Sequence, residues 1–307
     1  MRVIVAFDGS AAATDAVALV EAITWPADSV LRVVSVIEPT LMPSGPLYRS
    51  AGLAPELDEA ITAYTQDALQ AVVERLRSSG QAVEGDVLRG RVASAIIDDA
   101  RGFGADLLVV GSRGHGTIAS LLLGSVSSEV VDHAHCPVLV ARTTDLTRVV
   151  FATDGSPSAG AAELILSEWP IFAGLPIRVV SVADVVRPWT TGIAPTMYGQ
   201  ALDAYSAELR EAKVEHERIA ADTATRLHGG GRLADAEVRA GDAAAEIIAV
   251  VEQQRADLAV LGSRGRTGLT RLLLGSVARN VLSGSTASVL IVRDGAEELP
   301  EVGAAPT

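Results

Sequence analysis

Short runs of apolar residues alternate with longer mixed segments along the chain. Residues 3–7, VIVAF, are apolar without interruption, which is typical of a strand buried on both faces of a parallel sheet. The mixed segment from Ser10 to about Ile23 begins with a serine that can cap a helix, and Pro26 lies just beyond its end. The same pattern predicts further strands near 31–37, 82–88, 106–110 and 137–141, and further helices near 56–79, 92–101 and 125–134. This alternation is typical of an α/β fold with a doubly wound, five-stranded parallel sheet.

The second half of the chain repeats the landmarks of the first. VIVAFDGS at the start returns as VVFATDGS, which places Asp154 opposite Asp8, and GSRG at 111–114 returns at 262–265. The early landmarks are 146 positions apart (154 − 8) and the late ones 151 (262 − 111), so the second half has five extra residues between them. We expect these residues to lengthen a loop or a helix, and a long polar helix is predicted near 200–228. The repeat indicates duplication of a whole domain.

The duplication divides the chain into two tandem domains of the same class. We place the first domain at 1–142, a short linker at 143–147 and the second domain at 148–293. The tail 294–307 is acidic and contains Gly, Pro and Ala, so it is expected to be disordered. Four prolines within 38–55 predict a loop in the first domain.

Composition and charge narrow the possible functions. Acidic residues outnumber basic ones by 38 to 25, giving a net charge of −13, which argues against a protein that follows a nucleic-acid backbone. The single cysteine, Cys136, cannot form an internal disulfide, and the first residues lack the pattern of a signal peptide. No run approaches the roughly 20 apolar residues of a membrane span. We therefore expect a cytoplasmic protein with neither a nucleic-acid nor a membrane partner.

A glycine motif follows the fourth expected strand of each half. It consists of Gly111, Ser112, Arg113 and Gly114, nine residues, then Gly124 and Ser125; the second copy is Gly262, Ser263, Arg264 and Gly265, nine residues, then Gly275 and Ser276. A glycine straight after a buried strand lets the chain turn sharply, and another lets backbone approach a phosphate without a Cβ in the way. The Gly-Ser pair opens a helix whose free N–H groups and positive dipole end suit an anion, and the arginine can neutralise phosphate charge. A single copy of either element is more often a plain turn or cap, but the complete motif occurs twice at the same spacing, which favours a phosphate site.

Asp8 and Asp154 each stand between the first strand and the first helix of their half. A carboxylate there can accept a hydrogen bond from a ribose hydroxyl or an adenine amino group. The alternative is a structural Asx turn or helix cap in Asp-Gly-Ser. The two roles are compatible, because a carboxylate has two oxygens.

Other sites are less favoured by the sequence. A P-loop needs Gly-Lys-Ser/Thr, but the one lysine is Lys213, and the dinucleotide glycine series is missing after the first strand. His133, His135 and Cys136 lie close together, but a structural zinc site needs four ligands, and the sequence offers no complementary pair. We therefore predict no metal held by the protein side chains alone. His115 lies in the phosphate loop and is treated as optional, because the second half has no matching histidine.

With these motifs the chain resembles a tandem universal stress protein, over about 1–142 and 148–293. The resemblance rests on Asp-Gly-Ser after the first strand, the Val-rich second strand, Gly-x2-Gly-x9-Gly-Ser and the final Pro-Val-Leu-Val strand. The second half departs from it with Ser-Thr-Ala-Ser-Val-Leu in place of His-Cys-Pro-Val-Leu. The resemblance implies two Rossmann-like domains of the adenine nucleotide alpha hydrolase-like kind. It also implies pairing of the halves through their last strands, 137–141 and 288–292, and a homodimer of whole chains.

Family members with the complete glycine motif bind ATP, so the resemblance implies ATP with Mg²⁺, up to two per chain. In this reading the aspartates contact the adenosine, the following glycines lie beneath it and a valine backbone meets the adenine, while the glycine loops and the Ser-Val pairs close on the phosphates. The residues implied are Asp8, Gly9, Val36, Gly111, Ser112, Arg113, Gly114, Gly124, Ser125 and Val126, and Asp154, Gly155, Val182, Gly262, Ser263, Arg264, Gly265, Gly275, Ser276 and Val277.

Three functions fit such a site. The first is a nucleotide-dependent regulator of a stress or growth-arrest response, whose loop conformation a protein partner detects. The second is a slow ATP hydrolase or an adenylyl-transferring enzyme of the same fold, and the third is a scaffold with a structural nucleotide. Hydrolysis needs a positioned water, a base and usually a metal. Neither glycine motif offers an acid or a repeated histidine as the base, which favours the regulator and predicts no catalytic residue.

Overall fold

The computed structural model describes residues 1–38, 53–114, 123–184, 195–266 and 274–294. Within these residues the strands form one ten-stranded sheet in the order β3-β2-β1-β4-β5-β10-β9-β6-β7-β8. The strands are β1 (Arg2–Ala6), β2 (Val30–Ile37), β3 (Ala82–Arg89), β4 (Leu107–Gly111), β5 (Val138–Ala141), β6 (Val149–Ala152), β7 (Pro176–Ala183), β8 (Leu233–Ala240), β9 (Leu258–Gly262) and β10 (Ser288–Val292). The helices are α1 (Ala11–Ala22), α3 (Leu53–Arg77), α4 (Val92–Phe103), α5 (Ser125–His133), α6 (Pro157–Glu168), α7 (Pro195–Gly229), α8 (Ala243–Gln254) and α9 (Ser276–Gly284).

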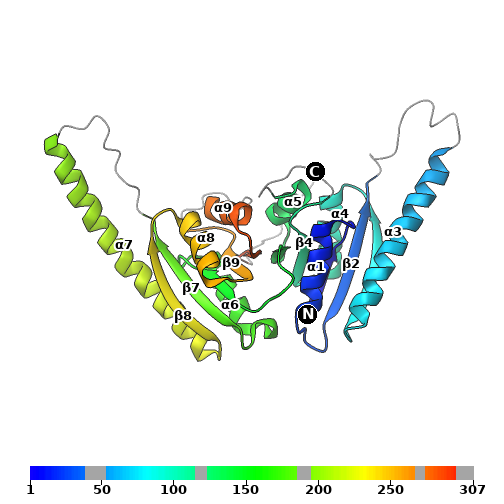
Figure 1. Cartoon of the computed structure of the whole chain (residues 1–307), viewed down its shortest axis with the longest axis horizontal. Coiled ribbons are helices and arrows are strands. Elements are labelled where there is room, and N and C mark those ends of the chain that lie inside the picture. Colours follow the sequence, from blue (N-terminus) through cyan, green and yellow to red (C-terminus); the bar gives the residue numbers. More distant parts are fainter. Residues whose placement is uncertain (39–52, 115–122, 185–194, 267–273, 295–307) are drawn as a thin grey trace, which may run out of the picture.

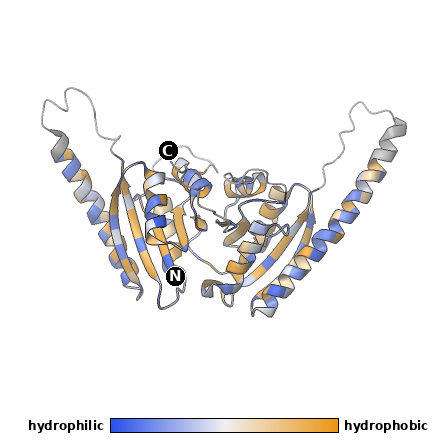
Figure 2. Cartoon of the chain, turned by 180° about the vertical axis from the view of Figure 1, so that it is seen from behind, coloured by the Kyte–Doolittle hydropathy of each residue, from blue (hydrophilic) through white to orange (hydrophobic). Residues whose placement is uncertain are grey.

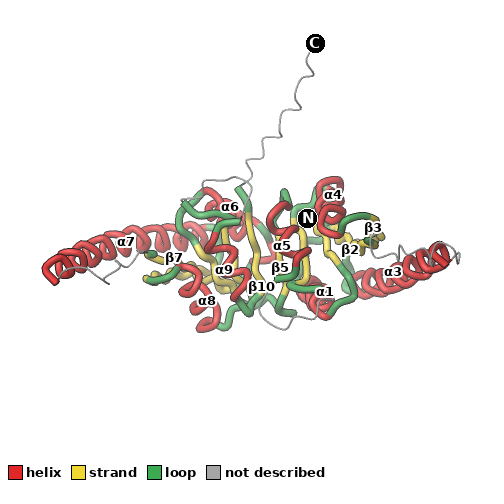
Figure 3. The backbone as a smooth tube through the Cα atoms, turned by 90° about the horizontal axis from the view of Figure 1, so that it is seen from above, coloured by secondary structure: helices red, strands yellow, loops and turns green. Residues whose placement is uncertain are grey.

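Each half has the doubly wound α/β fold that the sequence predicts. Its five strands are parallel, and the first and fourth strands lie side by side where the strand order reverses. The halves join through β5 and β10, which pair antiparallel with Leu139 opposite Leu290 and Val140 opposite Val289. These two strands lie side by side in the middle of the molecule (Figure 3).

Helices cover both faces of the sheet, which explains why its central strands are apolar throughout. Val3 and Val5 face a core cluster shared by α1, α3, α6 and α7, whereas Ile4 faces a second cluster shared by α4, α5, α8 and α9. Both clusters continue from one half into the other across the paired last strands. In Figure 2 the central strands are mostly apolar, whereas the helices mix apolar and polar residues.

The two long helices differ from the predictions at their starts. The sequence suggested a loop over 38–55, but α3 already begins at Leu53, with Pro55 in its first turn. Proline is tolerated there because the first-turn N–H groups have no partner within the helix; residues 39–52 lie outside the described part. The extra residues of the second half lie in helix, since α7 has 35 residues and α3 has 25. These two helices form the opposite flanks of the molecule (Figure 1).

The segment proposed as a linker is hydrogen-bonded to the second half. The hydroxyl of Thr143 lies 2.8 Å from Ser288 Oγ and donates to the carbonyl of Asp257 at 3.1 Å. The N–H of Thr147 donates to Asp257 Oδ2 at 2.9 Å. Of the predicted acidic tail, the structure describes only Asp294.

In the described residues, no helix has the length and apolar character needed to cross a membrane.

Candidate functional site

Asp-Gly-Ser follows β1 and β6 as a tight turn that begins the next helix. Gly9 and Gly155 have φ of 80° and 75°, in the left-handed region that glycine occupies most easily. Ser10 caps α1, because its Oγ accepts a hydrogen bond from the N–H of Ala13 at 3.2 Å. The Oδ1 atom of Asp8 accepts from the N–H of Ser10 at 2.9 Å, which is an Asx turn. The structural role considered for this aspartate is therefore present and uses one of its oxygens.

The second oxygen of each aspartate faces the glycine loop of its own half. A Cβ placed on Gly114 would lie 2.7 Å from Asp8 Oδ2, and one on Gly265 would lie 2.9 Å from Asp154 Oδ2. Both distances are too short for a real contact, so a side chain at either loop position would displace the carboxylate from where it lies. The structure thus brings together the two motifs that the sequence places more than 100 residues apart.

Gly111 and Gly262 serve a different purpose from the sharp turn that the sequence suggested. Neither is among the glycines with positive φ. A Cβ on Gly111 would lie 2.7 Å from the carbonyl carbon of Ala12, and one on Gly262 would lie 2.7 Å from the backbone N of Ala159. These glycines let the ends of β4 and β9 pack directly against the first turns of α1 and α6. The interpretation as turn residues is therefore wrong for this pair.

The Gly-Ser pairs fix the starts of α5 and α9 beside the loops. The N–H of Gly124 donates to the carbonyl of Ser112 at 2.9 Å, and that of Gly275 donates to Ser263 at 2.8 Å. No side chain caps either helix, and both Ser125 and Ser276 are exposed. The N–H groups of the first helical turn, including those of Val126 and Val277, therefore point toward the loop without a side-chain acceptor, which suits an anion.

The two loop arginines have different surroundings. Arg264 forms an ion pair with Asp294, with 2.5 Å between Nη2 and Oδ1. The matching position of the first half is Thr143, and the side chain of Arg113 is exposed. The backbone on both loops is held alike, because the Ser10 hydroxyl donates to the Arg113 carbonyl at 3.3 Å and the Ser156 hydroxyl to that of Arg264 at 3.1 Å.

The expected adenine contacts, Val36 and Val182, lie near the carboxyl ends of β2 and β7. Val182 is buried and Val36 half-buried. The preceding serines tie these strands to the aspartate turns, since Ser35 Oγ donates to the Phe7 carbonyl at 2.6 Å and Ser181 Oγ donates to Thr153 at 2.7 Å. All predicted site residues thus lie at the carboxyl ends of the strands, beside the switch in strand order, where ligands bind in this class of sheet.

Sequence reasoning missed His216, which lies on α7 within the charged run interpreted as a solvated face. Its Nδ1 lies 2.7 Å from Ser181 Oγ. Burial and then the charge of Arg266 lower the pKa of His216, while the carboxylates of Asp154 and Glu215 oppose that shift. The useful signal would have been the apolar spacing of this helix, because Ile219 and four further residues on the same face, Ala220, Thr223, Ala224 and Leu227, are buried.

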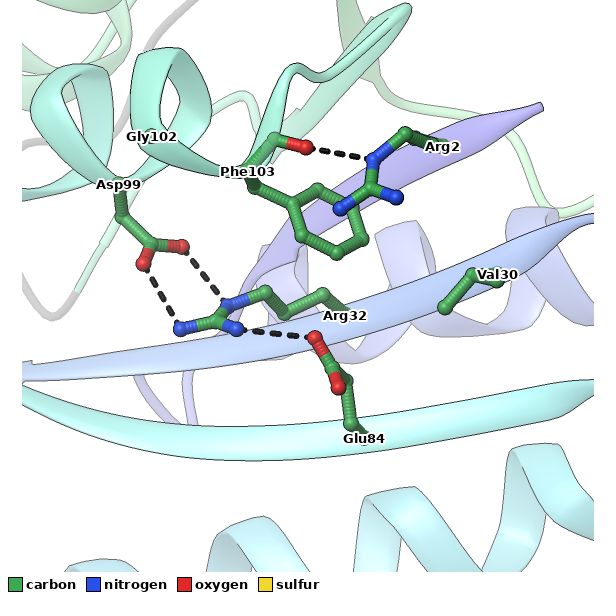
Figure 4. Close-up of a pocket in the computed structure, with 7 residues that line it drawn as sticks. All are labelled: Arg2, Val30, Arg32, Glu84, Asp99, Gly102 and Phe103. Atoms are coloured by element: carbon green, nitrogen blue, oxygen red, sulfur yellow. Dashed lines mark hydrogen bonds and ion pairs between the residues drawn. The ribbon is translucent and has the colours of Figure 1, made fainter.

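A separate pocket of about 370 Å³ lies at the opposite, amino ends of the strands (Figure 4). Arg32 binds both oxygens of Asp99, at 3.0 and 2.9 Å, and Glu84 at 2.9 Å. The guanidinium carbons of Arg2 and Arg32 lie 4.0 and 5.4 Å from the centre of the Phe103 ring. The acids already satisfy the charge of Arg32, so this network stabilises the fold and is not a ligand-site candidate.

The described residues contain no group of three or more His, Cys, Asp and Glu side chains able to hold a metal ion. Cys136 is buried, and burial raises the pKa of its thiol to about 12. A thiol with such a pKa stays protonated at neutral pH and is a poor metal ligand. His133 is exposed, with Nδ1 2.9 Å from the carbonyl of Glu129.

Two solved structures with similar folds span nearly the whole chain. A universal stress protein from Archaeoglobus fulgidus covers 96% of this chain and 98% of its own, at 19% identity and a TM-score of 0.65. A protein described as a putative universal stress protein from Pseudomonas aeruginosa covers 95% and 93%, at 18% identity and a TM-score of 0.59. At these identities the likeness shows a shared two-domain fold.

The sequence comparisons identify the family. Universal stress protein Rv1996 of Mycobacterium tuberculosis is 28% identical over 321 residues, covering 95% of each chain. A universal stress protein of Mycolicibacterium smegmatis is 30% identical over 281 residues, covering 87% of this chain and 88% of its own. One from Thermus aquaticus is 37% identical and covers 46% of this chain but 97% of its own, so it corresponds to a single half. The family model matches residues 1–142 and 146–293, and the chain therefore belongs to the Universal stress protein family.

Proposed function

We propose that each half binds one ATP with Mg²⁺ and that the protein is a nucleotide-dependent regulator of a stress or growth-arrest response. The observation that carries the proposal is the close approach of each aspartate to its glycine loop. Asp8 Oδ2 would touch a Cβ on Gly114, and Asp154 Oδ2 a Cβ on Gly265. A carboxylate and a phosphate-type loop thus meet twice in the same way, at the edge of the sheet where nucleotides bind in doubly wound folds.

The residues present fit an adenine nucleotide. The outer oxygen of each aspartate is an acceptor for a ribose hydroxyl, and the strand backbone at Val36 and Val182 can meet the base. The uncapped first turns of α5 and α9 offer N–H donors to phosphate oxygens, with Arg113 and Arg264 as the nearby cations. Bound Mg²⁺ would neutralise part of the phosphate charge in this acidic protein.

A regulator agrees better with this site than an enzyme does. Asp8 and Asp154 each already accept a hydrogen bond from a backbone N–H, so they serve as positioning groups of the turn. Nucleotide binding can shift the glycine loops between conformations that a partner protein distinguishes. A homodimer of whole chains in the cytoplasm stays part of this proposal.

The test begins with protein purified without added nucleotide. The chain is denatured, and the released material is identified by anion-exchange chromatography and mass spectrometry. ATP at nearly two per chain is the expected result. Release of ADP or AMP would instead favour an enzyme, and failure to bind ATP with magnesium in a subsequent titration would refute nucleotide binding.

A matched pair of variants tests the location. Gly114→Asp with Gly265→Asp adds carboxylates beside Asp8 and Asp154 and should abolish the rise in melting temperature that ATP produces. That rise reflects about 2.7 kcal/mol when the ligand is at about 100 times its Kd. Gly102→Asp with Gly229→Asp adds the same charges at exposed helical positions where a Cβ meets nothing within 4 Å. This control should respond to ATP like the parent; equal responses of both variants would place the site elsewhere.

A further inference from the structure

A cleft of about 430 Å³ opens beside the first glycine loop, at the junction of the two halves. The first half contributes the start of α1, Ser112, Arg113 and Arg142, and the second half contributes Ser285 and Thr286. The antiparallel pairing of β5 and β10 explains this neighbourhood, because it brings the end of β5 next to the start of β10. The phosphate loop of the first half is therefore flanked by residues of the second.

Arg142 is the unusual residue of this cleft. Its Nη2 donates to the carbonyl of Leu282 at 2.5 Å, at the end of α9, but its Nη1 is buried and has no hydrogen-bond partner. Burial and then the positive charge of Arg113 lower the pKa of Arg142 to about 10. A bound anion would shift this pKa in the opposite direction, because it favours the charged guanidinium.

The corresponding place in the second half is arranged differently. Arg293, the counterpart of Arg142, donates to the carbonyls of Val131 and Asp132 at the end of α5. The loop arginine there, Arg264, is bound to Asp294. In the first half the acid that lines the cleft is Asp15, on α1.

We propose that this cleft binds a phosphate group between Arg113 and Arg142, with the hydroxyl of Thr286 as a further donor. A guanidinium pair is suited to the geometry of phosphate oxygens. This phosphate is either the terminal phosphate of a nucleotide in the first glycine loop or free inorganic phosphate. The first alternative rests on the function proposed above. In both cases the anion site of the first half is incomplete without the second half.

The test compares Arg142→Gln with Arg293→Gln by isothermal titration calorimetry. Arg293 is the matched control, because it also follows the last strand of its half and also binds the end of a helix across the junction. One series titrates inorganic phosphate. The other titrates ATP and AMP with magnesium into chains that also carry Gly265→Asp, so that the first glycine loop alone is titrated. Melting temperatures without ligand verify that each variant is folded.

Arg142→Gln should weaken phosphate binding at least tenfold, while Arg293→Gln should not. If the terminal phosphate of the nucleotide occupies the cleft, Arg142→Gln weakens ATP at least tenfold and leaves AMP unchanged. If free phosphate occupies it, the variant weakens inorganic phosphate and leaves ATP unchanged. The proposal is overturned when Arg142→Gln matches the parent in both series.

A second pair protects the test against a folding defect. Thr286 is exposed, so Thr286→Glu and Thr286→Gln differ in charge at the same place in the cleft. The glutamate should weaken phosphate more than the glutamine, and equal affinities would contradict the site. Phosphate binding at Arg142 without any ATP binding would refute the nucleotide proposal alone. Two ATP per chain with no effect of either variant would refute the cleft alone.

Discussion

The Oδ2 atom of Asp154 accepts a hydrogen bond from the backbone N–H of Arg266, 3.0 Å away, while Oδ1 accepts from the N–H of Ser156 at 2.9 Å. One side chain thus connects the turn after β6 with the loop after β9. Because each oxygen has its own N–H donor, the carboxylate fixes the spacing of the two segments that we propose bind the nucleotide.

Replacing Asp154 should release the loop as well as weaken the ligand. Asp154→Ala removes the acceptor of two N–H groups. Losing a hydrogen bond to a charged group costs about 1.5–3 kcal/mol where the donor stays buried, and less where water replaces the lost acceptor. We expect the free energy of unfolding to fall by about 1–3 kcal/mol. Amide hydrogen exchange at Arg266 should also accelerate. Unchanged exchange there would show that this bond does not hold the loop.

Replacing the closely packed Gly111 by alanine should destabilise the protein, whereas the same replacement at the exposed Gly102 should stabilise it. Gly111→Ala forces a Cβ to within 2.9 Å of the backbone of Ala12 and Ala13, and such overpacking costs about 1–3 kcal/mol. Gly102, inside α4, meets nothing within 4 Å, so Gly102→Ala should stabilise the protein by about 0.5–1 kcal/mol. Urea unfolding measures both. A neutral Gly111→Ala would mean that β4 and α1 can separate easily.

His216 predicts a loss of stability in weak acid. Its pKa in the folded protein lies below the ordinary value of 6.5, mainly because of burial. Below that pH the unfolded chain binds the proton more readily, so the free energy of unfolding decreases as pH falls from 6.5 to the folded pKa, and it changes no further below that. One group contributes a slope of at most about 1.4 kcal/mol per pH unit, reduced here by partial exposure to solvent.

The measurement for this histidine is urea unfolding at pH 7.5 and 5.5. His216→Gln should shrink the difference between the two pH values, whereas His133→Gln makes the same chemical change at an exposed position and serves as the control. If His216→Gln kept the full difference, other groups would be responsible for the acid sensitivity.

Ser288 is expected to stabilise the junction of the two halves. Its buried Oγ accepts from the N–H groups of Arg142 and Thr143, at 3.0 and 3.1 Å. Ser288→Ala leaves these donors without their acceptor, which costs about 1–3 kcal/mol. Thr144→Ala, at an exposed neighbouring position, should change the free energy of unfolding by less than about 0.5 kcal/mol. Equal effects in urea unfolding would show that water replaces Ser288.

The fold could be predicted because the signals were local and repeated. Ser10 caps α1 and α5 begins at Ser125, as the sequence indicated. The start of α3 was wrong, because prolines argue against a helix interior but are compatible with its first turn. The role of Gly111 was misread because two different requirements both select glycine. One is close packing against a neighbouring backbone and the other is a positive φ, and a sequence does not show which of them applies.

Contacts between the halves were harder to foresee. Overlaying the two repeats predicts which residues are equivalent, but it says nothing of how Ser285 and Thr286 lie beside the loop of the other half. His216 was hidden for a related reason. It has no counterpart in the first half, so the repeat did not single it out, and the charged residues around it outweighed the buried face of α7.

The strands β5 and β10 pair antiparallel within one chain, so every junction contains one copy of each half. Two separate subunits would meet at a rate that depends on their concentration, whereas halves on one chain have a constant effective concentration for each other. Dilution cannot separate them. Neither half therefore needs to keep a surface that pairs with a second copy of the same half. Each is then free to change at the junction on its own, and the substitution of Asp294 in one half by Thr143 in the other is a difference that an identical pair could not maintain.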